Sequence, residues 1–220
     1  MFKIIAITNR NLCKGDFLKQ IEKIARAGVS AIILREKELS KKEYALLAEK
    51  VEKICRNDSV EFICHKHLAV AEEKKYRTIH VPMQQWKEEK GQQSDFQKGF
   101  DKIGTSVHSV TEAIEAEKMG AHYILAGHIF QTNCKKDLEP RGTAFLKEVV
   151  QAVSIPVYAV GGIQEKNIQE VQQTGAAGAC IMSGFMQAES PEKMVKMLTE
   201  SWNNCILKEN SASRQNLIFD

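Results

Sequence analysis

The sequence predicts a single (β/α)8 barrel, and two observations lead to this fold class. Eight short runs rich in β-branched residues alternate with stretches of helical periodicity, at about 27 residues per unit. Several of these runs are apolar throughout, which is typical of parallel strands covered on both faces. An open doubly wound sheet, the alternative for parallel strands, usually has about five or six strands. Eight equal units within 220 residues therefore favour the closed barrel.

The predicted strands follow one another along the whole chain. They are Lys3–Thr8, Ala31–Arg35, Glu61–His65, Thr78–Val81, Ile103–Val107, Tyr123–Gly127, Val157–Val160 and Gly178–Met182. The first strand runs into Thr8-Asn9-Arg10-Asn11, which lacks the glycines of a dinucleotide-binding turn. This absence also disfavours the open nucleotide-binding sheet.

Amphipathic helices are predicted between the strands. They are Asp16–Ala27, Ser40–Cys55, Val110–Met119, Ala144–Val153 and Ser190–Trp202. Gly28 provides a stop for the first helix, and Ser40 is the expected N-cap of the second. Pro191 suits the first turn of the last helix, because proline there loses no helical hydrogen bond.

Two segments fit the repeating pattern poorly. Met83–Phe100 is polar, rich in Gln and weakly periodic, so a loop and a short helix are expected there. Cys205–Asp220 is mostly polar and is expected to fray or to pack as an appendage. The chain is therefore divided into a barrel over residues 1–204 and a polar C-terminal tail over residues 205–220.

Composition and charge disfavour several classes of protein. The 31 basic and 28 acidic residues are interleaved, without the basic stripe of a nucleic-acid-binding protein. The longest apolar runs, such as Ala31–Leu34 and Ala177–Met182, are too short to cross a bilayer. No leader pattern precedes the first strand, and the six cysteines include no CxxC pair. Free thiols and a cytoplasmic location are expected.

In such a barrel, chemistry is expected where the strands end. Gly161-Gly162 follows the seventh strand, and Met182-Ser183-Gly184 ends and follows the eighth. Backbone amides at such turns can approach a phosphate without obstruction, so a phosphate site is predicted here; the alternative is a pair of tight turns that require positive φ. Arg35 and Lys37, after the second strand, add charge for an anionic ligand, unless they are simply solvated.

Histidines supply the candidates for proton transfer, because imidazole titrates near neutrality. His128 follows the glycine that ends the sixth strand and is the first candidate, with His108 as its competitor. A metal site from His65, His67 and His80 is the alternative use of histidine. No carboxylate or Cys falls at a familiar ligand spacing beside them, so no metal ligand is predicted.

Five motifs in order along the chain resemble the superfamily of thiamine-phosphate synthases and thiazole tautomerases. They are Leu34–Lys37 (LREK), Gly104–Glu112 (GTSVHSVTE), Gly127–Lys136 (GHIFQTNCKK), Tyr158–Ile163 (YAVGGI) and Ile181–Gly184 (IMSG). The resemblance covers nearly the whole chain. It implies a (β/α)8 barrel that binds a small-molecule thiazole phosphate at the glycine turns after the seventh and eighth strands, with no nucleic-acid or membrane partner.

Departures from the synthase pattern favour the tautomerase branch. Synthases have an Asn-Asp pair after the third strand and an Asp after the fourth, which hold magnesium and pyrophosphate; here Cys64–His67 and Pro82–Trp86 contain no carboxylate. The GHIF sequence looks like that of the tautomerase, in which the His is the proposed acid and base. The resemblance thus implies that His128 moves the proton that makes the carboxythiazole phosphate aromatic, without metal or cofactor.

Other residues and alternatives stay open at this point. Arg35, Lys37 or Lys135 is expected to hold the carboxylate or the phosphate of the thiazole, and Thr132 and Lys135 match positions that touch pyrophosphate in the synthases. The chain is alternatively a diverged thiamine-phosphate synthase, which joins a pyrimidine to a thiazole, or a non-catalytic regulatory barrel that binds thiamine or thiazole phosphate. Members of this superfamily are commonly oligomeric, so a homo-oligomer is also expected.

Overall fold

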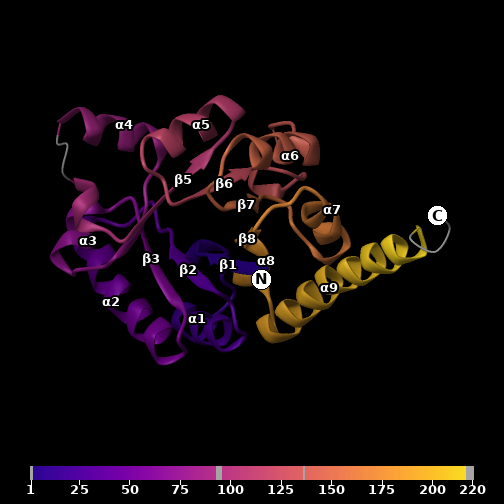
Figure 1. Cartoon of the computed structure of the whole chain (residues 1–220). Helices are drawn as coiled ribbons and strands as arrows, with labels where there is room; N and C mark the ends of the chain where they lie inside the picture. Colours follow the sequence, from indigo (N-terminus) through magenta and orange to yellow (C-terminus); the bar gives the residue numbers. More distant parts are fainter. Residues whose placement is uncertain (1, 93–95, 136, 217–220) are drawn as a thin grey trace.

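The computed structural model describes residues 2–92, 96–135 and 137–216, and its eight parallel strands close into a barrel in chain order (Figure 1). The strands are β1 Lys3–Ile7, β2 Ala31–Leu34, β3 Glu61–His65, β4 Thr78–His80, β5 Lys102–Val107, β6 Tyr123–Gly127, β7 Val157–Val160 and β8 Gly178–Ile181. Pairing of β8 with β1 closes the barrel. The predicted fold class is confirmed, and each predicted strand agrees to within one residue at both ends.

Alternating side chains along the strands form two apolar cores. Ile5, Ile33 and Leu125 point inside the barrel, where they pack with Tyr123 and Tyr158. The strand residues that alternate with these inward-pointing ones face the helices and belong to the larger outer core. This alternation is a consequence of strand geometry, in which successive side chains point to opposite faces. It also decides which residues just beyond a strand turn toward the mouth of the barrel.

The described helices link the strands and cover the outside of the barrel. They are α1 Phe17–Arg26, α2 Lys41–Asn57, α3 Leu68–Glu73, α4 Met83–Gln92, α5 Val110–Lys118, α6 Gly142–Ala152, α7 Ile168–Gln173, α8 Ser183–Gln187 and α9 Pro191–Asn216, with 3-10 turns η1 Arg10–Leu12, η2 Phe96–Gly99, η3 Asn133–Lys135 and η4 Glu165–Asn167. Ser40 caps α2 as predicted, and Glu43 completes a capping box with it. Gly28 follows α1 with φ of 84°, and α9 begins at Pro191, both as predicted.

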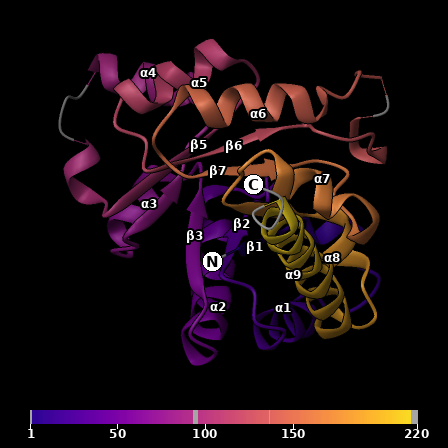
Figure 2. The same ribbon diagram turned by 45° about the vertical axis from the view of Figure 1, so that its right-hand side comes forward.

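Helix α9 packs against α1 and α7 (Figure 2). In Figure 1 its far end projects beyond the body of the barrel. The expected boundary at residue 204 falls inside this helix, which continues to Asn216. Residues 217–220 of the expected tail lie outside the described residues. Within Met83–Phe100, the expected short helix is α4, followed by η2. Residues 93–95 of that segment also lie outside the described residues.

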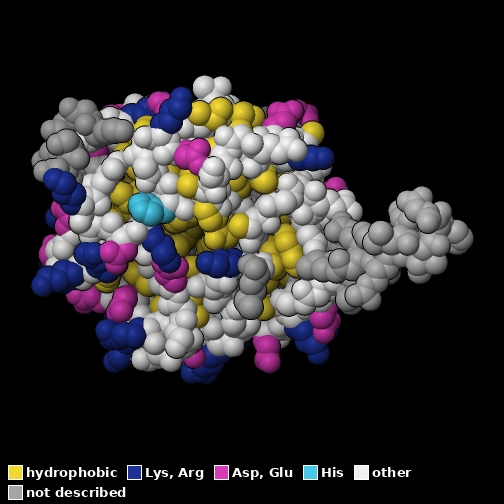
Figure 3. Space-filling view, in the orientation of Figure 1, with side chains coloured by type: hydrophobic (Ala, Val, Ile, Leu, Met, Phe, Trp, Pro, Cys, Tyr) yellow, Lys and Arg dark blue, Asp and Glu magenta, His cyan; other side chains and the backbone are white. Residues whose placement is uncertain are grey.

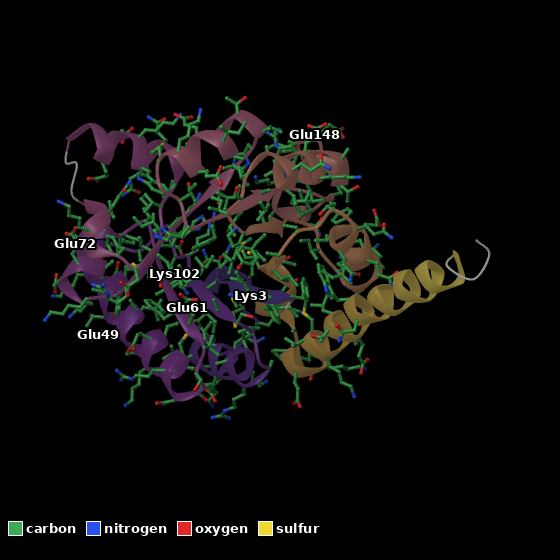
Figure 4. All side chains as sticks on the ribbon, viewed as in Figure 1. Lys3, Glu49, Glu61, Glu72, Lys102 and Glu148 are labelled. Atoms are coloured by element: carbon green, nitrogen blue, oxygen red, sulfur yellow. The ribbon has the colours of Figure 1, made fainter. Side chains whose placement is uncertain are left out.

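The end of the barrel at which the strands begin carries compensated charge. Figure 4 labels Lys3, Glu61 and Lys102, the first residues of β1, β3 and β5. Lys102 Nζ lies 2.9 Å from a Glu61 carboxylate oxygen. On this face basic and acidic side chains are interspersed around an apolar centre (Figure 3). No helix among the described residues is long and apolar enough to span a membrane, and the described cysteines are free thiols, as predicted.

Candidate active site at the carboxyl end of the barrel

Arg35 lies one residue beyond β2 and reaches over the mouth of the barrel. Its main-chain amide donates to Thr8 Oγ1 at 2.9 Å, and its guanidinium Nη1 lies 4.0 Å from Met182 Sδ, just beyond β8. Strand β1 lies between β2 and β8 in the sheet. The guanidinium therefore crosses the end of β1, which brings two of the predicted binding residues, Arg35 and Met182, together.

Lys37 belongs to a group of basic side chains at the same end of the barrel. The positive charge of Arg35 is the largest cause that lowers the Lys37 pKa, followed by partial burial and by the charges of Lys66 and Lys135. These side chains come from the loops after β2, β3 and β6. Arg35, Lys37, Lys66 and Lys135 together are called the cation cluster. Arg35, Lys37 and Lys135 were predicted from the sequence as binding residues, whereas Lys66 was not.

Glu36 lies between the two cations in sequence, yet its carboxylate is buried away from the mouth. It accepts hydrogen bonds from Thr8 Oγ1 at 2.6 Å and from the main-chain amide of Arg10 at 3.0 and 3.1 Å. Burial nonetheless raises its pKa, because desolvation outweighs these bonds. Glu36 thus ties the loop after β1 to the end of β2, and Thr8 in turn fixes the Arg35 amide. This role of Glu36 was not predicted, although alternation along β2 places Glu36 on the face opposite to Arg35.

Two buried histidines line the interior below the cation cluster. His80 Nε2 lies 2.9 Å from Ser106 Oγ, and its Nδ1 lies 3.3 Å from the Tyr123 hydroxyl. The His65 ring stacks on His80 with centroids 5.7 Å apart. Burial, with a smaller effect of the Arg35 charge, lowers the His80 pKa to about 3, and burial also lowers the pKa of His65 well below its usual value. Both rings are therefore neutral near pH 7.

The third histidine considered for a metal site lies apart from this pair. His67 stacks on Tyr44 with ring centroids 4.0 Å apart, and Tyr44 is buried with its hydroxyl bonded to the Leu34 carbonyl oxygen at 2.8 Å. Tyr44 belongs to the outer core, between the sheet and α2. The structure therefore brings His65 and His80 together but places His67 on the other side of the sheet.

The glycine turns after β7 and β8 are close-packed. Gly161 and Gly162 have φ of 100° and 68°, which L side chains rarely adopt. A Cβ at Gly161 would overlap the Cβ of His128, and one at Gly162 would come within 2.6 Å of the Phe130 carbonyl oxygen. The turn interpretation is thus sufficient to explain both glycines. Ser183 opens the short helix α8, whose first amides have no partner within the helix; a phosphate site here stays a prediction.

Gly184 is close-packed against side chains, whereas the other binding candidates after the eighth strand are partly exposed. Gly184 is the second residue of α8, and a Cβ there would come within 2.7 Å of Met194 Cε and 3.0 Å of Ile181 Cγ2. Its small size is thus used in packing α9 against the barrel. Met182 and Ser183 remain partly exposed at the mouth.

His128 is buried beneath the loop between β6 and α6. Its Nε2 lies 3.3 Å from the Leu138 carbonyl oxygen, and its own carbonyl oxygen accepts a hydrogen bond from the Arg141 amide at 2.9 Å. Only 5% of the residue is exposed. His128 therefore contacts both the middle and the end of this loop. His108, its competitor, places Nδ1 2.6 Å from the Gly127 carbonyl oxygen.

Thr132 and Lys135 lie in the same loop, on a tight turn. The Thr132 carbonyl oxygen accepts the Lys135 amide at 3.0 Å, and Thr132 Oγ1 accepts the Cys134 amide at 3.4 Å. The Lys135 pKa is lowered by burial and then by the charges of Arg141 and Arg35. Lys135 is thus close enough to Arg35 for the two charges to interact across the mouth.

The residues at this mouth do not fit the magnesium ion that the synthase resemblance implies. Magnesium is usually held by one or two carboxylates together with substrate oxygens. Beyond β3 and β4 the structure instead places Lys66 beside Gln85 of α4, whose Nε2 donates to the Lys66 carbonyl oxygen at 2.9 Å. The nearby Glu36 is occupied by Thr8 and Arg10. No group of three or more His, Cys, Asp or Glu side chains among the described residues is arranged to hold a metal ion.

Comparison with known proteins identifies close relatives of the whole barrel. The family described as thiamine monophosphate synthase, TMP-TENI, matches residues 4–185. The thiamine-phosphate synthase of Fusobacterium nucleatum is 33% identical over 202 residues, which cover 91% of this chain and 97% of that protein. That of Shouchella clausii is 36% identical over 196 residues, covering 85% and 90%. The structure of thiamine phosphate pyrophosphorylase from Pyrococcus furiosus superposes with a TM-score of 0.78 at 27% identity, covering 93% and 96%.

These findings overturn the prediction of a thiazole tautomerase, and with it the prediction of an isomerase. The relatives similar over most of the chain are named synthases, so the alternative of a pyrimidine–thiazole coupling enzyme fits better. The prediction depended on the missing carboxylates and on the likeness of the GHIF sequence to that of the tautomerase. In the structure the His of this sequence, His128, lies under a loop, where its Nε2 meets the Leu138 carbonyl oxygen.

Proposed function

Because the chain belongs to the thiamine monophosphate synthase (TMP-TENI) family, we propose that it is a thiamine-phosphate synthase, which joins a pyrimidine pyrophosphate to a thiazole phosphate. The observation that carries this proposal is the similarity to synthases over nearly the whole chain. The site supports it, since two groups of anion-binding candidates occupy different parts of one mouth and the reaction has two anionic substrates.

The thiazole phosphate is assigned to the turns after β7 and β8. Gly161, Gly162, Ser183 and Gly184 have little side-chain bulk there, and the first amides of α8 have no partner within the helix. Met182, partly exposed at the end of β8, offers an apolar surface for the thiazole ring beside the Arg35 guanidinium. Binding the phosphate at a distance from the reacting atoms fixes the orientation of the ring.

The pyrophosphate of the pyrimidine substrate is assigned to the cations after β2 and β6, beside the proposed thiazole site, with the Arg35 guanidinium between the two sites. Arg35 and Lys37 come from the β2 end, and Thr132 and Lys135 come from the loop after β6. Arg35 suits an oxygen-rich group because its guanidinium donates two parallel hydrogen bonds. The mutual repulsion that lowers the pKa of Lys37 is relieved when an anion binds among these charges.

The coupling needs charge stabilisation at the leaving group more than proton transfer. A carbon–nitrogen bond forms between the methylene carbon of the pyrimidine and the ring nitrogen of the thiazole. The carbon–oxygen bond to pyrophosphate breaks, and its electron pair leaves with the pyrophosphate, while the thiazole nitrogen becomes cationic. Cations placed where the negative charge develops lower the barrier of such a step. No residue has to remove a proton from carbon in this reaction.

His128 is assigned a positioning role in place of the catalytic role expected from its sequence. Its imidazole and carbonyl oxygen contact Leu138 and Arg141, near the end of the loop that carries Thr132 and Lys135. By holding this loop against the end of β6, His128 sets where the Lys135 ammonium lies. Its effect on the reaction is therefore indirect.

The test is direct formation of thiamine phosphate by the purified full-length protein. Both substrates are supplied with and without magnesium, and the product is measured by fluorescence after oxidation. Product is expected only when both substrates are present. Arg35→Met should lower kcat/KM by about 10- to 100-fold, because a charge-assisted bond to the anion is lost, whereas Lys3→Met at the opposite end of the barrel should keep wild-type activity.

Two outcomes would count against the proposal. Absence of thiamine phosphate in every condition, with thiazole phosphate still bound in calorimetry, would favour the non-catalytic binding barrel. Equal loss of activity in Arg35→Met and Lys3→Met would show that the effect of Arg35 is not specific to the mouth.

A further inference from the structure

The mouth of the barrel concentrates positive charge, and no salt bridge among the described residues joins Arg35, Lys37, Lys66 or Lys135 to a carboxylate. Arg35 crosses the end of β1 to reach Met182, and Lys66 stands immediately after β3, with its main-chain amide bonded to the His80 carbonyl oxygen at 2.9 Å. Strand β3 is next to β2, and the registers place Cys64 beside Leu34. The residues that follow these two strands, Arg35 and Lys66 among them, are therefore neighbours at one edge of the mouth.

Two nearby carboxylates have hydrogen-bond partners outside the cation cluster. Glu36 is buried on bonds to Thr8 and to the Arg10 amide. Glu38 accepts a hydrogen bond from Arg10 Nε at 3.0 Å, and the charge of Arg35 has a smaller effect in lowering its pKa. Among the described residues, the charges that shift the pKa values of Lys37 and Lys135 are positive. The opposite end of the barrel differs, since Lys102 is paired there with Glu61.

Helix α4, which follows β4, contacts Lys66 through a neutral side chain. Gln85 Nε2 donates to the Lys66 carbonyl oxygen. Glu88, one turn further along α4, accepts a hydrogen bond from Gln84 at 2.8 Å. A divalent cation placed here would meet ammonium groups and an amide, whereas it requires several anionic or strongly polar oxygens.

We propose that the cation cluster of Arg35, Lys37, Lys66 and Lys135 binds the pyrophosphate of the pyrimidine substrate directly, so that coupling proceeds without a divalent metal ion. This inference rests on the proposed synthase function. Lys66 and Lys37 supply the positive charge that a magnesium ion would otherwise supply to the leaving group. The two neutral imidazoles of His65 and His80 below the cluster add no further positive charge to it.

The experiment combines binding and turnover on the full chain freed of metal with EDTA. Binding of inorganic pyrophosphate is measured by calorimetry in EDTA and again with magnesium, and coupling is measured in the same two buffers. Wild-type protein is expected to bind pyrophosphate in EDTA, and its coupling rate should change less than about threefold when magnesium is added. Thermal unfolding of each variant checks that it is folded.

Variants test whether the cluster is the site. Lys66→Met and Lys37→Met keep most of the side-chain length but remove the charge. Each should weaken pyrophosphate binding in EDTA by about tenfold or more, as expected for loss of one charge-assisted bond. Lys3→Met, which removes a lysine from the far end of the barrel, should leave the affinity unchanged. Unchanged affinity in both mouth variants would overturn the assignment of the site.

The outcomes separate this inference from the proposed function. Coupling that appears only with magnesium would refute metal-free catalysis and leave the synthase function standing. Pyrophosphate binding in EDTA without coupling in either buffer would refute the synthase function while supporting the metal-free anion site. If the protein does not bind pyrophosphate in EDTA and does not catalyse coupling in either buffer, both the inference and the synthase function are refuted.

Discussion

Replacing His80 by Gln should reduce the fall in the free energy of unfolding of the barrel at acidic pH. His80 is 3% exposed, and its two ring nitrogens face Ser106 Oγ and the Tyr123 hydroxyl. The stacked His65 ring and the Arg35 charge are the other titratable or charged groups that act on it. A Gln amide offers both a donor and an acceptor to the same two hydroxyls. The substitution therefore removes the titrating group with little change in polarity.

The size of the effect follows from the two pKa values. The ring titrates near 6.5 when the chain is unfolded and at about 3 in the folded barrel. Below pH 6.5 the unfolded state binds the proton first, so the free energy of unfolding falls as the pH falls. At pH 5 the loss is about 2 kcal/mol, from about 1.4 kcal/mol per pH unit. This figure holds for any folded pKa well below 5, and corresponds to about 4–8 °C in Tm for a chain of this length.

The assay is urea unfolding of wild type and His80→Gln at pH 7.5 and pH 5.0. The free energy of unfolding should fall between the two pH values by about 2 kcal/mol more in wild type than in the variant. The contribution of His65 has the same sign but is present in both proteins, so it largely cancels. Lys3→Met controls for pH effects unrelated to the ring. An equal fall in wild type and His80→Gln would show that the folded barrel accommodates the protonated ring, and would refute the reasoning.

Two further substitutions probe the loops around the mouth. Gly161→Ala places a side chain at φ of 100° and against His128 Cβ, so the free energy of unfolding should fall by about 1–3 kcal/mol, with weaker calorimetric binding of thiazole phosphate; wild-type values for both would contradict this account of the turn. His128→Asn should raise the KM for the pyrimidine substrate several-fold while kcat changes less than about threefold in steady-state kinetics. A large loss of kcat at unchanged KM would instead make His128 a catalytic residue.

The barrel could be predicted closely because its signals are local. Strands such as Tyr123–Gly127 and Val157–Val160 are short apolar runs whose ends coincide with a change to polar or glycine residues. The N-cap of α2 at Ser40 is likewise encoded within one turn of sequence. Helices α7 and α8, of six and five residues, are too short to show a helical stripe, and no sequence pattern gave their bounds.

The candidate site was harder to predict because it depends on contacts between distant segments. Arg35 and Lys37 were found from their place after a strand, but the reach of Arg35 to Met182 depends on the closure of the barrel. The burial of Glu36 depends on Thr8, 28 residues earlier. His128 was expected in the mouth because it follows a strand. Tyr123 and Leu125 point into the barrel, so alternation along the strand places His128 on the outer face. This orientation could have been deduced from the sequence.

The absence of carboxylates directly after β3 and β4 says more about how charge is balanced at the mouth than about which reaction takes place there. Similarity to a synthase extends over 91% of the chain, whereas the carboxylates that the synthase resemblance implies occupy only a few positions. Lys66 and Gln85 lie in contact at the edge where acids would be needed for magnesium, and neither side chain is acidic. Negative charge at this edge without a metal ion would repel pyrophosphate. Under the proposed function, Arg35, Lys37 and Lys135 together with Lys66 provide ammonium and guanidinium groups as the counter-charge for the leaving group.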